Sequence, residues 1–225
     1  MATTTSPRVD HRLDPRPTDD GPSFGARAAI MGSVSLAVVV VALLLPSWPA
    51  GPDMGSTHYM GLLAANQPWN LLLFMAVPVV AAETIAITEL VILFRGGDAG
   101  RIGLVNRWAG IVAGLYFLGV VTYLLKEAVF PLTRDAGWRG PADLIAVGFY
   151  LLGLIPLYGM TLLEARLIAA DADARTRLKW HATFVGIFLV VAHVAMIFGM
   201  LDPTVLGWSP VHTMPDGGTM SGMVH

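Results

Sequence analysis

The chain has 225 residues, of which 55% are hydrophobic and only 13% are charged, and its formal net charge is −2. Soluble domains carry about 25% charged residues, so this composition indicates an integral membrane protein. The net charge provides no basic field for nucleic acid. The chain contains no cysteine, which excludes disulfides, iron–sulfur clusters and thiolate metal sites.

The chain begins with a polar stretch, residues 1–27, in which Arg and Asp alternate and prolines recur. This composition is typical of a disordered arm. We expect apolar helices to follow over about residues 28–45, 71–94, 108–130, 144–168 and 182–201. Each can cross about 30 Å of hydrocarbon at a rise of about 1.5 Å per residue. The predicted fold is therefore an all-α integral membrane protein with five transmembrane helices.

The first predicted helix differs from a cleavable signal peptide. The junction LLLPSWPA has Trp48 where cleavage after Ala50 needs a small residue, so a retained anchor is favoured. The predicted organisation is a cytoplasmic arm, an N-terminal anchor helix, a four-helix core and a flexible His/Met tail. These parts span residues 1–27, 28–45, 46–208 and 209–225, respectively.

The Lys and Arg residues are distributed unevenly among the polar segments. Eleven fall on the side of the N-terminal arm and three on the other side. Because basic segments stay in the cytoplasm, we expect the N-terminus inside and the C-terminus outside. The abundance of Ala, Gly, Val and Arg favours a bacterial source, hence a multi-pass protein of the bacterial plasma membrane. The first loop, 46–70, and the tail then share the outer face.

A family resemblance covers about residues 57–208. It is carried by the segments THYMGLLAANQPWNLLLFM, AETIAITEL, GWRGPADLIAVGFYLLG and HATFVGIFLVVAHVAMIFGMLDPTVLGW. These segments resemble a family of small, uncharacterised bacterial membrane proteins that sometimes carry a permease label. The resemblance implies membership of that family and no particular activity.

Ionisable groups inside membrane helices are costly and are therefore candidates for function. Glu83 and Glu89 fall in the second predicted helix, about 120° apart around its axis, so they do not form a carboxylate pair. Tyr123 and Tyr150 fall in the third and fourth helices. We expect all four side chains to be buried, with Glu83 hydrogen-bonded to another helix or else uncharged. Glu83, the two tyrosines and His193 are expected to form one polar layer in the outer half.

Soft metal ligands recur on the predicted outer side. His193, Met196 and Met200 follow i, i+3, i+7 spacing and share one face of the fifth helix. Further ligands in the outer segments are His58, Met60, His212, Met214 and His225. Imidazole and thioether together suit copper, particularly Cu(I). The pattern predicts a copper-handling or redox-associated protein, although methionine also fills cores and His193 can be a packing residue bonded to Glu83 or Tyr150.

Three other functions stay open. A single haem b can be held by His193 with either His58 or Met60. A small permease or proton-linked transporter can relay protons through Glu83 and Glu89. A non-catalytic assembly subunit needs buried polar groups only for packing. His181, next to Trp180, is expected to be an interfacial anchor.

No sequence motif in the chain favours an enzyme class. The chain lacks a Gly-rich phosphate loop, a GxSxG elbow and an HExxH pair. The expected partners are the lipid bilayer and another membrane redox or metal-handling protein, with no nucleic acid.

Overall fold

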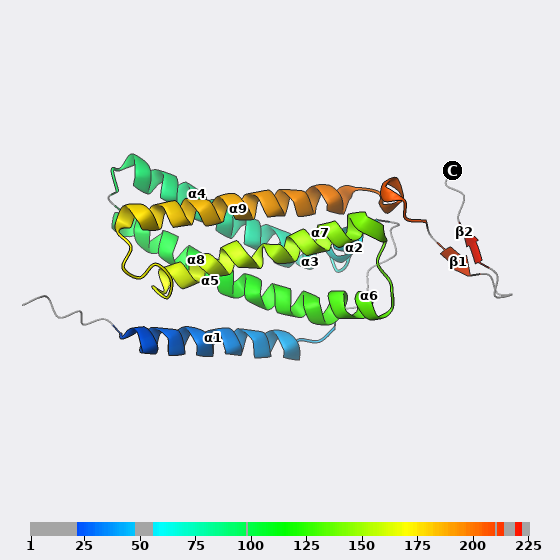
Figure 1. Ribbon diagram of the computed structural model, residues 1–225, viewed down its shortest axis with the longest axis horizontal. Coiled ribbons are helices and arrows are strands. Elements are labelled where there is room, and N and C mark those ends of the chain that lie inside the picture. The colour runs from blue at the N-terminus through cyan, green and yellow to red at the C-terminus, as the bar shows by residue number, and fades with distance from the viewer. Residues whose placement is uncertain (1–21, 48–55, 98, 210, 214–218, 222–225) are drawn as a thin grey trace, which may run out of the picture.

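The protein is a bundle of long helices (Figure 1). A computed structural model describes residues 22–47, 56–97, 99–209, 211–213 and 219–221. Within them, the segments long and apolar enough to cross a membrane are Phe24–Leu44, Trp69–Phe94, Gly100–Arg134, Gly140–Glu164 and Ala174–Met200. The predicted class, an all-α membrane protein with five transmembrane helices, is confirmed.

The long segments are built from the helices α1 (Phe24–Leu44), α4 (Val77–Phe94), α5 (Gly100–Leu124), α7 (Gly140–Leu152), α8 (Leu154–Glu164) and α9 (Ala174–Met200). Shorter helical elements are α2 (His58–Ala64), α3 (Trp69–Leu71), the π-helical η1 (Leu72–Ala76) and η2 (Leu125–Val129), α6 (Phe130–Arg134) and the 3₁₀ element η3 (Pro203–Leu206). Beyond the bundle, β1 (Val211–Thr213) pairs antiparallel with β2 (Thr219–Ser221), although the tail was expected to lack regular structure.

Several helices begin earlier than the apolar stretches predict. The helix α5 begins at Gly100 instead of about 108, and α9 begins at Ala174 instead of about 182. The added turns are polar, and α9 is started by Asp173, whose side chain accepts a hydrogen bond from the backbone N–H of Thr176 at 3.0 Å. An apolar window detects the part of a helix that crosses hydrocarbon, so it misses polar turns that extend beyond it.

The helix α5 lies at the centre of the bundle and packs against α1, α4 and α8, while α9 packs against α4, α7 and α8. The helices α5 and α8 come very close at Gly114, where an added Cβ would lie 2.1 Å from Thr161 Oγ1. Small residues at such crossings allow close packing of membrane helices, where dispersion replaces the hydrophobic effect as the attraction. The Thr161 hydroxyl also donates to the Gly110 carbonyl at 3.1 Å, which satisfies it inside the bundle.

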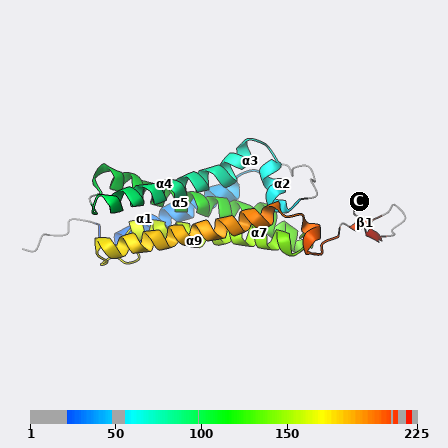
Figure 2. The ribbon, with the colours of Figure 1, turned by 90° about the horizontal axis from the view of Figure 1, so that it is seen from above.

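The helix α1 is the least enclosed of the long helices. It runs along one side of the bundle in Figures 1 and 2, and Ala42 is its one buried residue. The Ser35 hydroxyl lies 2.8 Å from the hydroxyl of Tyr158 on α8. The core therefore consists of the other four long segments.

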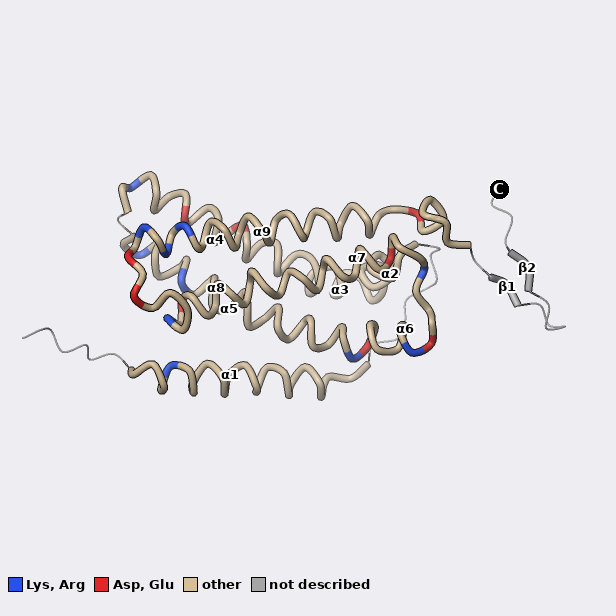
Figure 3. Tube along the Cα trace, viewed as in Figure 1, with Lys and Arg blue, Asp and Glu red and all other residues tan. Residues whose placement is uncertain are grey.

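The two ends of the bundle differ in charge. Lys and Arg gather where the loops 95–99 and 165–173 lie, together with the N-terminal end of α1 (Figures 1 and 3). We call this the arginine-rich end. The opposite end carries α2, α6 and η3.

Candidate functional site

A cavity of about 260 Å³ lies between α4 and α9, on the half of the bundle toward the opposite end. Its walls are mainly aromatic: Phe74, Phe117, Phe149, Tyr150 and Phe188. Four further lining residues carry groups that can bind a cation, namely Met75, Glu83, His193 and Met196. We refer to this space as the α4–α9 cavity. It brings Glu83, His193 and Tyr150 to one place.

The His193 imidazole is held in one tautomer by its own helix. Its Nδ1 lies 2.6 Å from the backbone carbonyl oxygen of Leu189. A carbonyl oxygen only accepts, so Nδ1 must carry the proton and donate, which leaves the lone pair of Nε2 available when the ring is neutral. Metal-binding histidines are commonly oriented in this way, with the second ring nitrogen donating to a backbone carbonyl.

Met75 is positioned by a local irregularity of the backbone. In η1 the Val77 N–H donates to the Leu72 carbonyl, five residues back, and Pro78 has no N–H to donate to Phe74. The carbonyls of Leu73 and Phe74 are thereby released. Tyrosine hydroxyls satisfy both: Tyr116 donates to Leu73 at 2.9 Å and Tyr150 donates to Phe74. The π-helical turn η1 is thus held by hydrogen bonds from tyrosines on α5 and α7, and Met75 lies in this turn.

Glu83 differs from expectation. Its side chain is exposed instead of buried, although it lines the cavity from α4. In the described part of the chain no hydrogen bond or ion pair reaches its carboxyl group, so the expected partner on another helix is not present. His193 is also exposed. Because both are exposed, the cavity opens to the surface between α4 and α9.

Tyr59 also lines the cavity, from α2. Burial raises the pKa of its hydroxyl to about 12. The group therefore stays protonated at neutral pH and does not supply a phenolate ligand. Tyr123 and Tyr150 are buried, as is Glu89.

The remaining predicted ligands lie elsewhere. Met200 is 66% exposed at the end of α9 and does not line the cavity. Met60 packs against the hydrophobic core. His212 lies in β1, opposite Met220 of β2. Met214 and His225 fall outside the described residues.

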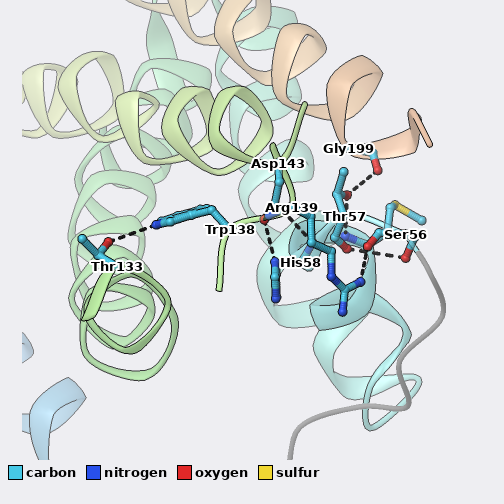
Figure 4. Close-up of polar contacts among 9 residues, drawn as sticks. Ser56, Thr57, His58, Thr133, Trp138, Arg139, Asp143 and Gly199 are labelled. Atoms are coloured by element: carbon cyan, nitrogen blue, oxygen red, sulfur yellow. Dashed lines mark hydrogen bonds and ion pairs between the residues drawn. The ribbon is translucent and has the colours of Figure 1, made fainter. Parts of the chain in front are cut away.

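His58 is engaged by a carboxylate at the opposite end of the bundle. Its Nδ1 lies 2.6 Å from Asp143 Oδ2, and its backbone N–H donates to Asp143 Oδ1 at 2.7 Å (Figure 4). Asp143 is fully buried and also accepts from the Arg139 backbone N–H. The Arg139 guanidinium donates to the Ser56 carbonyl (Figure 4) and lies over the Trp208 ring at 5.9 Å. This arrangement ties the segment before α2 to the start of α7, so His58 serves packing here.

A second polar cluster lies toward the arginine-rich end. His181 on α9 is 5% exposed, and its Nδ1 and Nε2 each lie 2.6 Å from a carboxylate oxygen, of Glu89 and of Glu164, respectively. Arg177 NH2 donates to the other Glu164 oxygen at 3.3 Å. The distances place both ring nitrogens within ion-pair range of a carboxylate, although the angle at Nδ1 is poor for a hydrogen bond to Glu89. We call these four residues the His181 cluster.

The His181 cluster corrects one expectation and shows what pattern reasoning missed. His181 is not an interfacial anchor, because its imidazole points into the bundle and pairs with α4 and α8. Glu164 was overlooked although it falls inside the fourth apolar stretch, 144–168, where an ionisable group indicates a buried partner. Asp143 was missed because it immediately precedes that stretch.

No cluster of three or more His, Cys, Asp or Glu side chains in the described part of the chain has the arrangement of a metal site. A metal site in the α4–α9 cavity would instead rely on methionine thioethers, and methionine is not one of those four residue types. The two residues predicted as the second axial ligand of a haem, His58 and Met60, do not line the cavity with His193.

Comparison with protein families gives one match. The model of a family of unknown function matches residues 54–215, from just before α2 to just beyond β1. This range contains the cavity and the His181 cluster and leaves out α1. No curated protein and no solved structure matches the chain.

Proposed function

The chain belongs to the family of unknown function DUF6803, and we propose that it is a membrane protein that handles a soft metal cation, Cu(I), in the α4–α9 cavity. The observation that carries this proposal is the donor set: the Nε2 lone pair of His193 beside the thioethers of Met75 and Met196. Imidazole and thioether ligands favour Cu(I) over hard cations such as Mg²⁺ or Ca²⁺.

The charge of the cavity supports the same proposal. Glu83 is the one acidic side chain that lines it, and no described cation pairs with Glu83. A carboxylate without a partner within a membrane span is costly. A bound monovalent cation would offset that cost, and the aromatic walls would keep competing water ligands away. The sequence predicts His193 and Met196 as ligands. The proposal adds Met75 as the third ligand and Glu83 as the charge that balances the cation.

The proposal includes an orientation in the bacterial plasma membrane. The arginine-rich end would face the cytoplasm, so the cavity would lie in the outer half of the membrane. The tail, with its His and Met residues, would then collect copper near the cavity, since a tethered cluster raises the local metal concentration. Another membrane redox or metal-handling protein would supply or receive the ion.

Reporter fusions test this orientation. Alkaline phosphatase joined after His225 is expected to be active, and the same enzyme joined after Gly97 is expected to be inactive, because it folds only outside the cytoplasm. The reason is the eleven-to-three distribution of Lys and Arg between the two sides. Reversed activities would place the cavity in the inner half and remove the role proposed for the tail.

Deleting residues 211–225 distinguishes copper bound by the tail from copper bound in the cavity. We expect the truncated protein to bind less copper in total and to keep one tighter Cu(I) equivalent, since the donors of the cavity all lie on η1, α4 and α9. Metal analysis after equilibration with a Cu(I) chelator measures both quantities. Loss of all bound copper in the truncated protein would assign binding to the tail and contradict the cavity site.

A proton-linked permease is the second candidate, and one feature favours it. Glu89 on α4 pairs with His181 on α9, and nearer the opposite end Glu83 on α4 and His193 on α9 both line the cavity. Acidic and imidazole groups at successive depths can relay protons. Proton uptake by vesicles that contain the protein, lost on Glu89→Gln but unaffected by copper, would favour this function. A Soret band in the purified protein would instead favour haem.

A further inference from the structure

A second, larger cleft opens at the arginine-rich end, and we propose that it binds a phosphate-bearing group. Its volume is about 1020 Å³. The walls come from the end of α4, the start of α5, the loop after α8 and the start of α9. The carboxylates and imidazole of the His181 cluster lie at its base. We call it the arginine cleft. This proposal does not depend on the metal site.

The charges that line the cleft are unbalanced. Arg107, Arg166, Arg175 and Arg177 line it, together with Glu89 and Glu164. Both carboxylates are already paired with His181. The four arginines outnumber the two carboxylates even with a neutral His181, so the lining has a surplus of positive charge that an anion would offset.

Most N–H donors of the arginines that line the cleft have no carboxylate partner among the described residues. Arg166 and Arg175 are exposed, and no described carboxylate pairs with either one. Arg107 Nε lies 3.9 Å from Glu164 Oε2, which is beyond hydrogen-bond distance. A guanidinium carries five N–H donors in a planar fork, a geometry that matches the oxygens of a phosphate.

The remaining lining residues fit a phosphate ester better than a bare ion. Asn106 is buried, and its Oδ1 has no hydrogen-bond donor among the described residues, so it can accept from a ligand hydroxyl. Leu93 and Leu104 are more than half exposed on the wall of the cleft and offer apolar surface for an acyl chain. Basic pockets between membrane helices bind anionic lipid headgroups in this way. A phospholipid headgroup and a soluble phosphate ester share this chemistry.

The test uses the full-length protein in two arms. One arm measures binding of phosphatidylglycerol to the detergent-solubilised protein, with phosphatidylcholine as the reference lipid, and the other measures binding of inorganic phosphate and glycerol phosphate. The variant is Arg166→Gln with Arg175→Gln. Each basic residue near an anionic surface contributes about fivefold in affinity, so we expect the double variant to bind about 30-fold more weakly. Saturable binding of phosphatidylglycerol but not phosphatidylcholine in the lipid arm identifies a headgroup, and saturable binding in the other arm identifies a soluble ester.

The matched control is Arg95→Gln with Arg101→Gln. Both arginines are exposed at the same end, and neither lines the cleft. The control removes the same charge and should retain the affinity of the parent within about twofold. Equal loss in both double variants would show general surface attraction and overturn the proposal. If the melting curve shows that the parent protein is folded, absence of saturable binding in both arms would also overturn the proposal.

Discussion

Replacing His181 with alanine is expected to destabilise the protein by about 3–5 kcal/mol. The change leaves Glu89 and Glu164 buried on either side of an empty position, without the cation that lies 2.6 Å from each of them. Breaking a buried ion pair costs much more than the pair itself contributes. Here Glu89 keeps a buried charge without a described partner, whereas Glu164 retains Arg177. In detergent, the melting temperature should fall by about 10 °C.

The matched control is His193→Ala. His193 is on the same helix, but it is exposed and its hydrogen bond goes to a backbone carbonyl within its own helix. This change should alter stability by no more than about 0.5 kcal/mol. Adding Glu89→Gln and Glu164→Gln to His181→Ala should recover part of the loss, because it removes the buried charges. Equal melting temperatures for the His181 and His193 variants would show that the His181 cluster contributes nothing to stability.

The second large effect concerns metal affinity. Met196→Leu keeps the size and apolar character of the side chain but removes a thioether from the cavity, so Cu(I) affinity should fall at least about tenfold. His193→Ala removes the nitrogen ligand, and affinity should fall at least about 100-fold. Competition with a chromogenic Cu(I) chelator measures both values.

Met200→Leu is the control for Met196→Leu. Met200 lies one turn further along α9, is 66% exposed and does not line the cavity. The control should bind Cu(I) like the parent. If both methionine variants weaken binding equally, the metal is held on the exposed face of α9 and not in the cavity.

The fold follows from the sequence because spanning helices depend on local composition. Each of the five long apolar stretches can be recognised from its own residues alone. The predicted ends of the helices lie within a few turns of the observed ends. The early start of α9 was missed because Arg175 and Arg177 make its first turns polar. Capping by Asp173, rather than hydropathy, determines where it begins.

The site follows from the sequence only in part because side-chain pairing depends on which helices meet. The sequence predicts Glu83 and His193 in one polar layer, and both line the α4–α9 cavity. No pattern along one helix shows that His181 on α9 reaches Glu164 on α8, or that His58 reaches Asp143 across 85 residues. Those pairs arise from the packing of separate segments. They explain why one histidine predicted as a ligand is engaged by a carboxylate instead.

We propose that His193, Met196 and Met75 bind Cu(I) together in the α4–α9 cavity. X-ray absorption at the copper edge tests it most directly, on Cu(I)-loaded protein from which residues 211–225 have been deleted. We expect one nitrogen and two sulfur scatterers around the metal, with one sulfur lost in Met196→Leu. A first shell of nitrogen and oxygen alone, unchanged in that variant, would contradict it.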